Sequence, residues 1–334
     1  MLRGTPVAAM PPHSAVRLAS INRGRSPGGL RRLAGKAEPF RTVRRRSRFQ
    51  KLRPLSCVAV PRLMMSLESD LRPVSKSLSW NIPPPNVSAS KNEVHVWRVP
   101  LDKTLVAEMR PTLSPDECAR ADRFHFARDR NRFIVARGSL RMILGSYLDR
   151  APAAVSFSYS NYGKPALLDE NSAVTSGITF NLSHANELAL IAVTCDRQIG
   201  VDIEFIRPDF ASRRIAERFF SRQEVEVLRG LPAGQQADAF FNCWTRKEAY
   251  IKALGEGMSM PLHQFNVSLA PGSAAALLGN LRDPAEVSRW ALQDLAPGPG
   301  YVAAVAVEGP GWQLECWQTP IAWPAPLALG ESIA

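Results

Sequence analysis

Short stretches of alternating apolar and polar residues predict strands in two parts of the chain, because alternation places every second side chain on one face of a sheet. In the first part these stretches are Val94–Val99, Val155–Tyr159, Ile178–Leu182, Leu188–Thr194 and Ile199–Glu204. In the second part they are Phe265–Leu269, Ser288–Leu292, Tyr301–Val307 and Trp312–Gln318.

Helix signals fill the segments between these strands. Ser114 and Ser221 are each followed three residues later by Glu, a capping box that marks a helix start. Long helices are expected over about Asp129–Leu148 and over Ala237–Leu254, the second ending at a glycine. The polar segment Ser183–Glu187 predicts a turn between two strands.

The order strand, helices, strands occurs twice, before and after about residue 205. This repetition predicts an α+β fold of two pseudo-symmetric halves, 92–204 and 205–320, with the active site between them. Residues 321–334 are expected to form a tail.

Composition adds few constraints. The 334 residues are 45% hydrophobic and 22% charged, as in ordinary globular proteins. The longest apolar runs, such as Leu188–Val193, are much shorter than the ~18 residues that span a bilayer, so no membrane contact is expected. The five cysteines include no CxxC pair, which favours a reducing compartment such as the cytoplasm.

The net charge of +12 is concentrated at the N-terminus. Residues 1–65 hold fifteen Lys or Arg and one acid, a charge of +14, so the other residues sum to 12 − 14 = −2. A near-neutral body argues against nucleic acid as a partner. Residues 1–75 are expected to be a disordered basic tail with three interpretations: an organellar transit peptide, an arm that contacts nucleic acid or an acidic partner, or an upstream start codon before Met64 or Met65.

Two acidic groups are candidates for metal binding. Asp202 and Glu204 stand two apart on a predicted strand and therefore project from one face. Paired carboxylates suit Mg²⁺, which takes one or two of them together with phosphate oxygens. The alternative is a strand end with two solvated acids. Glu248 and Lys252 stand four apart on a helix, which by itself indicates a surface ion pair. The aromatic and apolar residues around them favour a functional role for this pair over a solvent-exposed one.

Phosphate binding would have to come from separate side chains, because the chain has no GxxxxGK[ST] or GxGxxG loop. Ser183 and His184 could hydrogen-bond a phosphate, although a turn histidine is more often an ordinary surface residue. Arg132 and Lys164 suit a ligand with several phosphates, although arginines this dense usually form a solvated helix face.

The motifs in combination resemble those of the phosphopantetheinyl transferases. GVDIE at 200–204 and WTRKEAYIK at 244–252 resemble the two signatures of that family, and NLSH at 181–184 and YGKP at 162–165 are similar to its other conserved segments. The length and internal duplication are similar to those of the larger, monomeric Sfp-type class. Ala249 stands where the family often has Ser.

This resemblance implies a Mg²⁺-dependent monomer that transfers 4'-phosphopantetheine from coenzyme A to a serine of an apo acyl or peptidyl carrier protein. Asp202, Glu204 and Glu248 would hold Mg²⁺. Glu248 would also be the base, directly or through water, and Lys252 would neutralise the leaving group. The residues that would contact coenzyme A are Arg132, Lys164, Ser183 and His184.

Two other hypotheses fit part of the pattern. A Mg²⁺-dependent nuclease also uses paired carboxylates with a lysine nearby, but it predicts a basic body, which the −2 balance contradicts. A module that binds coenzyme A or a carrier without transfer would not need the complete set Asp202, Glu204, Glu248 and Lys252.

Overall fold

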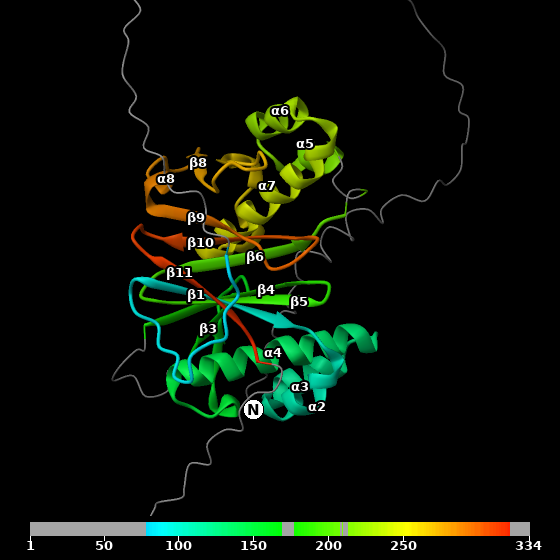
Figure 1. The fold of residues 1–334 in the computed structure, drawn as a ribbon, viewed down its shortest axis with the longest axis vertical. Coiled ribbons are helices and arrows are strands. Elements are labelled where there is room, and N and C mark those ends of the chain that lie inside the picture. The colour runs from blue at the N-terminus through cyan, green and yellow to red at the C-terminus, as the bar shows by residue number, and fades with distance from the viewer. Residues whose placement is uncertain (1–77, 169–176, 208, 210–212, 321–334) are drawn as a thin grey trace, which may run out of the picture. The chain divides into compact units, whose positions relative to one another are not determined.

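The computed structural model describes residues 78–168, 177–207, 209 and 213–320 (Figure 1). The predicted tails at 1–75 and 321–334 lie outside the described residues. The fold is α+β, as the sequence predicts, because helices cover sheets built mainly of antiparallel strands. Within the described ranges, no helix combines the length and the apolar character needed to cross a membrane.

The first sheet has four strands in the order β11-β1-β5-β4. β11 runs parallel to β1, and the other neighbours are antiparallel. The strands are β11 (Gln313–Gln318), β1 (Glu93–Pro100), β5 (Leu188–Cys195) and β4 (Ile178–Ala185).

The second sheet is antiparallel, in the order β6-β10-β9. Its strands are β6 (Ile199–Phe205), β10 (Tyr301–Glu308) and β9 (Trp290–Leu295). The strands of the two sheets are therefore not divided at residue 204. β6 belongs to the sheet of the second half, and β11, the last strand of the chain, belongs to the sheet of the first half.

A long helix covers the outer face of each sheet (Figure 1). α4 (Ala127–Leu148) packs on the first sheet, with Leu140 and Ile191 in one buried cluster. α7 (Ala233–Leu254) packs on the second sheet, in a cluster that contains Ala304. Apolar residues between the sheets form a third cluster, so the layers are helix, sheet, sheet and helix.

Shorter elements connect these layers. The helical segments are η1 (Lys103–Leu105), α2 (Val106–Met109), η2 (Arg110–Thr112), α3 (Pro115–Asp122), η3 (Pro152–Ala154), α5 (Arg213–Phe219), α6 (Arg222–Gly230), η4 (Gly257–Ser259), η5 (Leu262–Gln264) and α8 (Glu286–Arg289). The short strands are β2 (Phe157–Tyr159), β3 (Pro165–Leu167), β7 (Phe265–Val267) and β8 (Leu277–Asn280).

Both predicted capping boxes are confirmed, at Ser114 and at Ser221. The predicted turn Ser183–Glu187 is wrong, because β4 continues to Ala185 and only two residues remain for the turn. Asn186 adopts a left-handed conformation with φ of 46°, and asparagine tolerates this conformation better than most residues, so a tight turn is possible here. Ser183 and His184 therefore lie on a strand.

Candidate active site

The acidic strand β6 contacts α7 directly, and a glycine makes this contact possible. A Cβ atom on Gly200 would lie 2.1 Å from the carbonyl oxygen of Ala249 and 2.3 Å from the nitrogen of Ala253. Val201 and Ile203 point the other way, into the cluster between the sheets. Side chains alternate along a strand, so Asp202 and Glu204 lie on the same face as Gly200, toward α7.

Asp202 is the centre of a buried polar group built from three elements. Its Oδ1 accepts hydrogen bonds from Ser183 Oγ of β4 at 2.9 Å and from Lys252 Nζ of α7 at 2.6 Å. Lys252 Nζ also donates to Ser183 Oγ at 2.8 Å and to the Val201 carbonyl at 3.3 Å. The structure thus brings together residues from three of the sequence motifs.

Two further carboxylates are buried beside this group. Glu204 is 1% exposed and Glu248 is 5% exposed. Burial raises the pKa of Glu204 well above its usual value, and the charges of Asp202 and Glu248 raise it further, while Lys252 opposes the shift. Glu204 Oε1 is buried and has no hydrogen-bond partner within the described part of the chain.

These observations fit a divalent cation. A buried acid whose pKa is raised by neighbouring acids is stabilised as a carboxylate when a positive charge lies among them, and oxygen donors suit Mg²⁺. In the described ranges, no group of three His, Cys, Asp or Glu side chains is already arranged as a metal cage. Mg²⁺ tolerates such an open arrangement, because it commonly keeps only one or two carboxylates and completes its shell with phosphate oxygens and water.

His184 on β4 interacts electrostatically with Lys252 of the acidic group and with Arg132 on α4. Burial lowers the pKa of His184 to about 4, and the charges of Lys252 and Arg132 lower it further, so its imidazole is neutral at pH 7. Arg132, on α4, forms an ion pair with Glu187. The Nε of Arg132 is buried and lacks a hydrogen-bond partner among the described residues. This arrangement leaves a donor for an anion beside the imidazole.

Lys164 lies at another point on the same two elements. Its Nζ donates to the carbonyl oxygen of Ile199 at 3.3 Å, where β6 begins, and to that of Ala253 at 2.9 Å, near the end of α7. Burial lowers the pKa of Lys164 from 10.5 to about 8. The structure does not bring its ammonium group into the hydrogen bonds around Asp202, and its role in phosphate binding stays a prediction.

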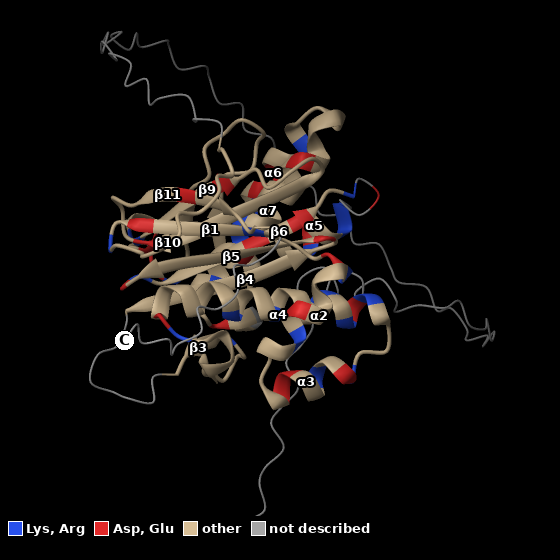
Figure 2. Ribbon diagram, turned by 60° about the horizontal axis from the view of Figure 1, so that its bottom comes forward, with Lys and Arg blue, Asp and Glu red and all other residues tan. Residues whose placement is uncertain are grey.

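The sequence analysis placed Asn181 in the NLSH segment but gave it no role; this residue is 5% exposed, and its Oδ1 accepts a hydrogen bond from the Val201 N–H at 2.9 Å. The available signal was its position two residues before Ser183 on a strand, which places both side chains on one face. Acidic and basic residues are otherwise interspersed over the described elements (Figure 2).

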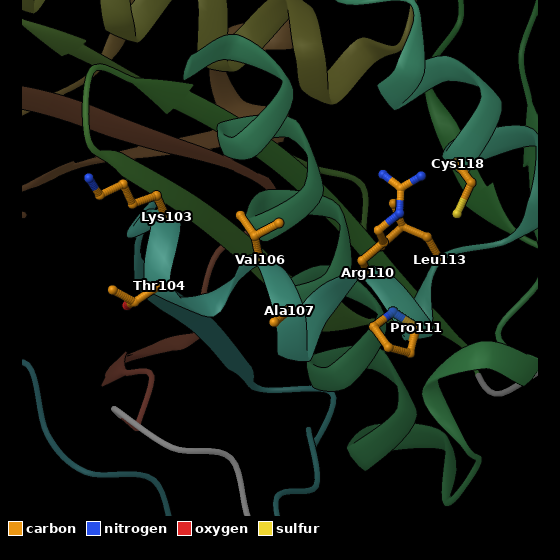
Figure 3. A pocket seen from close by; sticks show the side chains of 8 residues that line it. All are labelled: Lys103, Thr104, Val106, Ala107, Arg110, Pro111, Leu113 and Cys118. Carbon is orange, nitrogen blue, oxygen red and sulfur yellow. The ribbon is translucent and has the colours of Figure 1, made fainter. Parts of the chain in front are cut away.

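A groove lies elsewhere on the surface, beside α2 (Figure 3). Its volume is about 640 Å³, and residues between Lys103 and Cys118 line it. None of the predicted site residues is among them, so this groove is separate from the acids and their cationic neighbours.

Comparison with known families agrees with this geometry. Residues 96–196 match the family described as "4'-phosphopantetheinyl transferase, N-terminal", and residues 198–306 match the "4'-phosphopantetheinyl transferase superfamily". The boundary between the two matches falls just before β6, the strand that carries the paired acids.

Individual relatives have the same assignment. The 4'-phosphopantetheinyl transferase HetI of a Nostoc species is 44% identical over 241 residues, which cover 72% of this chain and 98% of HetI. The 4'-phosphopantetheinyl transferase Sfp of Bacillus subtilis is 30% identical, over 59% of this chain and 83% of Sfp. The human L-aminoadipate-semialdehyde dehydrogenase-phosphopantetheinyl transferase is 27% identical, over 60% of this chain and 68% of the human protein. The chain therefore belongs to the 4'-phosphopantetheinyl transferase superfamily, and within it to the Sfp-like type.

Proposed function

We propose that this protein transfers the 4'-phosphopantetheine group of coenzyme A to a serine of an apo acyl or peptidyl carrier protein, in a Mg²⁺-dependent reaction. The observation that carries the proposal is the buried set Asp202, Glu204 and Glu248, which faces Lys252. Burying several acids is costly unless a cation offsets their charge. A reaction on a pyrophosphate gives the site a reason to retain them.

Asp202, Glu204 and Glu248 would hold the Mg²⁺ ion. When bound, Mg²⁺ neutralises the charge of the pyrophosphate and of the group that leaves. The raised pKa of Glu204 and the unpartnered Oε1 support this assignment, since the nearby cations do not offset burial and the charges of Asp202 and Glu248, and no hydrogen bond within the described residues reaches Oε1. Lys252 supplies a fixed positive charge next to Asp202.

Ser183, His184 and Arg132 would contact the phosphates and the adenosine part of coenzyme A, and Lys164 is retained as a fourth candidate. A neutral imidazole donates one hydrogen bond without adding charge, whereas the partly buried guanidinium of Arg132 provides both charge and direction. The orphan Nε of Arg132 favours an anionic ligand at this position.

In the reaction, the oxygen of the carrier serine bonds to the β-phosphorus of coenzyme A. The bond from that phosphorus to the bridging oxygen breaks, and 3',5'-bisphosphoadenosine leaves with the electron pair. Glu248 takes the serine proton, directly or through a water molecule. Lys252 stabilises the charge that develops on the leaving oxygen.

Intact mass spectrometry of apo carrier proteins tests the proposal. The purified chain with coenzyme A and Mg²⁺ should add one phosphopantetheine arm to a single carrier serine, and EDTA should abolish the addition. We expect Asp202→Ala and Glu248→Gln to abolish turnover in folded protein, whereas Glu108→Gln, at an exposed position on α2, should retain it.

No mass gain on any carrier, with folded protein and Mg²⁺ present, would refute the proposal and favour a module that binds without transfer. A panel of fatty acid, polyketide, nonribosomal peptide and aminoadipate carriers would rank the substrates. The monomeric state, the cytoplasmic location and its organellar alternative, and the absence of nucleic-acid and membrane partners stay predictions.

A further inference from the structure

β4 and β6 lie side by side as the edge strands of two different sheets. In the part of the chain that the structure describes, the ladder of the first sheet ends at β4 and that of the second sheet ends at β6. No backbone ladder therefore sets the position of one edge against the other. The polar groups of a buried strand edge need other partners.

Side chains on one face of β4 provide these partners. Thr179, Asn181 and Ser183 alternate along the strand and form what we call the polar ladder. Thr179 Oγ1 donates to the Arg197 carbonyl, and Ser183 Oγ donates to Asp202 Oδ1 at 2.9 Å. Between them, Asn181 Oδ1 accepts from the Val201 N–H at 2.9 Å.

Asn181 thus holds the main chain directly before the acid at the centre of the site. Val201 is held twice, by Asn181 at its N–H and by Lys252 Nζ at its carbonyl, 3.3 Å away. The Asn181 side chain is 5% exposed, so water does not readily replace it. A lateral shift of β6 at Val201 would carry the Asp202 carboxylate away from Ser183 and Lys252.

We propose that Asn181 is a positioning residue, which sets the orientation of the Asp202 carboxylate by fixing β6 against β4. It does not reach the reacting atoms, and it acts through Val201. This inference rests on the metal role of Asp202 in the proposed function. Residues that orient a metal ligand typically change metal affinity by about 10- to 100-fold when they are replaced.

Metal binding without substrate gives a readout that is separate from transfer. Mn²⁺ serves as a paramagnetic probe for the Mg²⁺ site, and its affinity is measured by electron paramagnetic resonance on the full chain. Asn181→Leu removes the acceptor but keeps a side chain of similar size. Thr179→Val is the matched control, because it removes a rung of the same polar ladder at its other end.

We expect Asn181→Leu to weaken Mn²⁺ binding about 10- to 100-fold, and Thr179→Val to keep the wild-type affinity even if both variants unfold at lower temperature. Wild-type affinity in Asn181→Leu, or an equal loss in Thr179→Val, would overturn the assignment. If Asn181→Leu does not fold, Asn181→Ser replaces it, since the shorter serine side chain does not extend to the position of the Asn181 amide oxygen that accepts from Val201. Asn181→Asp retains an acceptor at this position and should restore binding.

The same experiment separates this inference from the proposed function. Wild-type protein that binds no Mn²⁺ and transfers nothing would refute the proposed function itself. Wild-type protein that binds Mn²⁺ and modifies the carrier, together with an unaffected Asn181→Leu variant, would refute only the positioning role.

Discussion

Replacing Gly200 by Ala should separate α7 from β6 and disable the site. The new Cβ would lie 2.1 Å from the Ala249 carbonyl oxygen, whereas real Cβ contacts are essentially never below 3.0 Å. The neighbouring backbone must therefore move by at least 3.0 − 2.1 = 0.9 Å. Both atoms nearest to the new Cβ belong to the α7 backbone, so no flexible side chain can absorb the shift.

Two magnitudes follow from this displacement. Overpacking of a buried contact costs about 1–3 kcal/mol, and we expect the upper end here because backbone is displaced. In a domain of this size, a loss of about 3 kcal/mol lowers the melting temperature by about 6–12 °C. α7 also carries Lys252, whose Nζ is 2.6 Å from Asp202, and a misplacement of about 1 Å in a catalytic group can slow the reaction about 100-fold.

Urea denaturation and carrier modification measure the two effects. Gly234→Ala is the control, because this glycine lies in the first turn of the same helix with open space around its Cβ position, and alanine there should add up to about 1 kcal/mol. The reasoning would be refuted if the free energy of unfolding of Gly200→Ala lay within about 0.5 kcal/mol of the wild-type value and the variant modified the carrier at the wild-type rate.

Three lysines on or beside α7 should respond differently when they are replaced. Lys252→Met should abolish transfer, since it removes the charge beside Asp202, and a mass-spectrometric rate close to that of the wild type would contradict this role. Lys247→Met should instead cost about 3–5 kcal/mol of stability, because it leaves Glu224 buried without its cation, and Mn²⁺ binding by the folded fraction should persist. The pKa of Lys164 falls from 10.5 to about 8 on folding, so the unfolded chain binds more protons between these values and stability should rise with pH across that window. Lys164→Met should flatten this rise in urea titrations, and an unchanged slope would show that Lys164 is not the cause.

Much of the site could be predicted from sequence because its main features are local. Residues two apart on a strand and four apart on a helix share a face, which is sufficient to pair Asp202 with Glu204 and Glu248 with Lys252. The two capping boxes were visible for the same reason, since each involves only four consecutive residues. The end of β4 could not be predicted, because a strand can continue through polar residues when their side chains bond to another sheet. Ser183 is such a residue, since its Oγ donates to Asp202.

The long-range pairing could not be predicted. Nothing in the sequence around β11 indicates that it pairs with β1, about 220 residues earlier in the chain, since register depends on the partner strand as well as on the pattern itself. For the same reason, the position of Lys164 between the start of β6 and the end of α7 appears only once the chain has folded.

The second signature motif shows why a match in sequence does not assign roles by itself. Successive residues of a helix point about 100° apart, so Glu248 and Lys252 share a direction that Lys247 does not. Lys247 Nζ pairs with Glu224 at 2.9 Å and donates to the Leu262 carbonyl at 2.8 Å, both within the second half of the chain. Lys252 reaches Asp202 and Ser183 instead. One helix therefore links the packing of the second half to the geometry of the acids. For this reason, loss of the Lys247 charge on one side of α7 should reduce stability, whereas loss of the Lys252 charge on the other side should stop transfer.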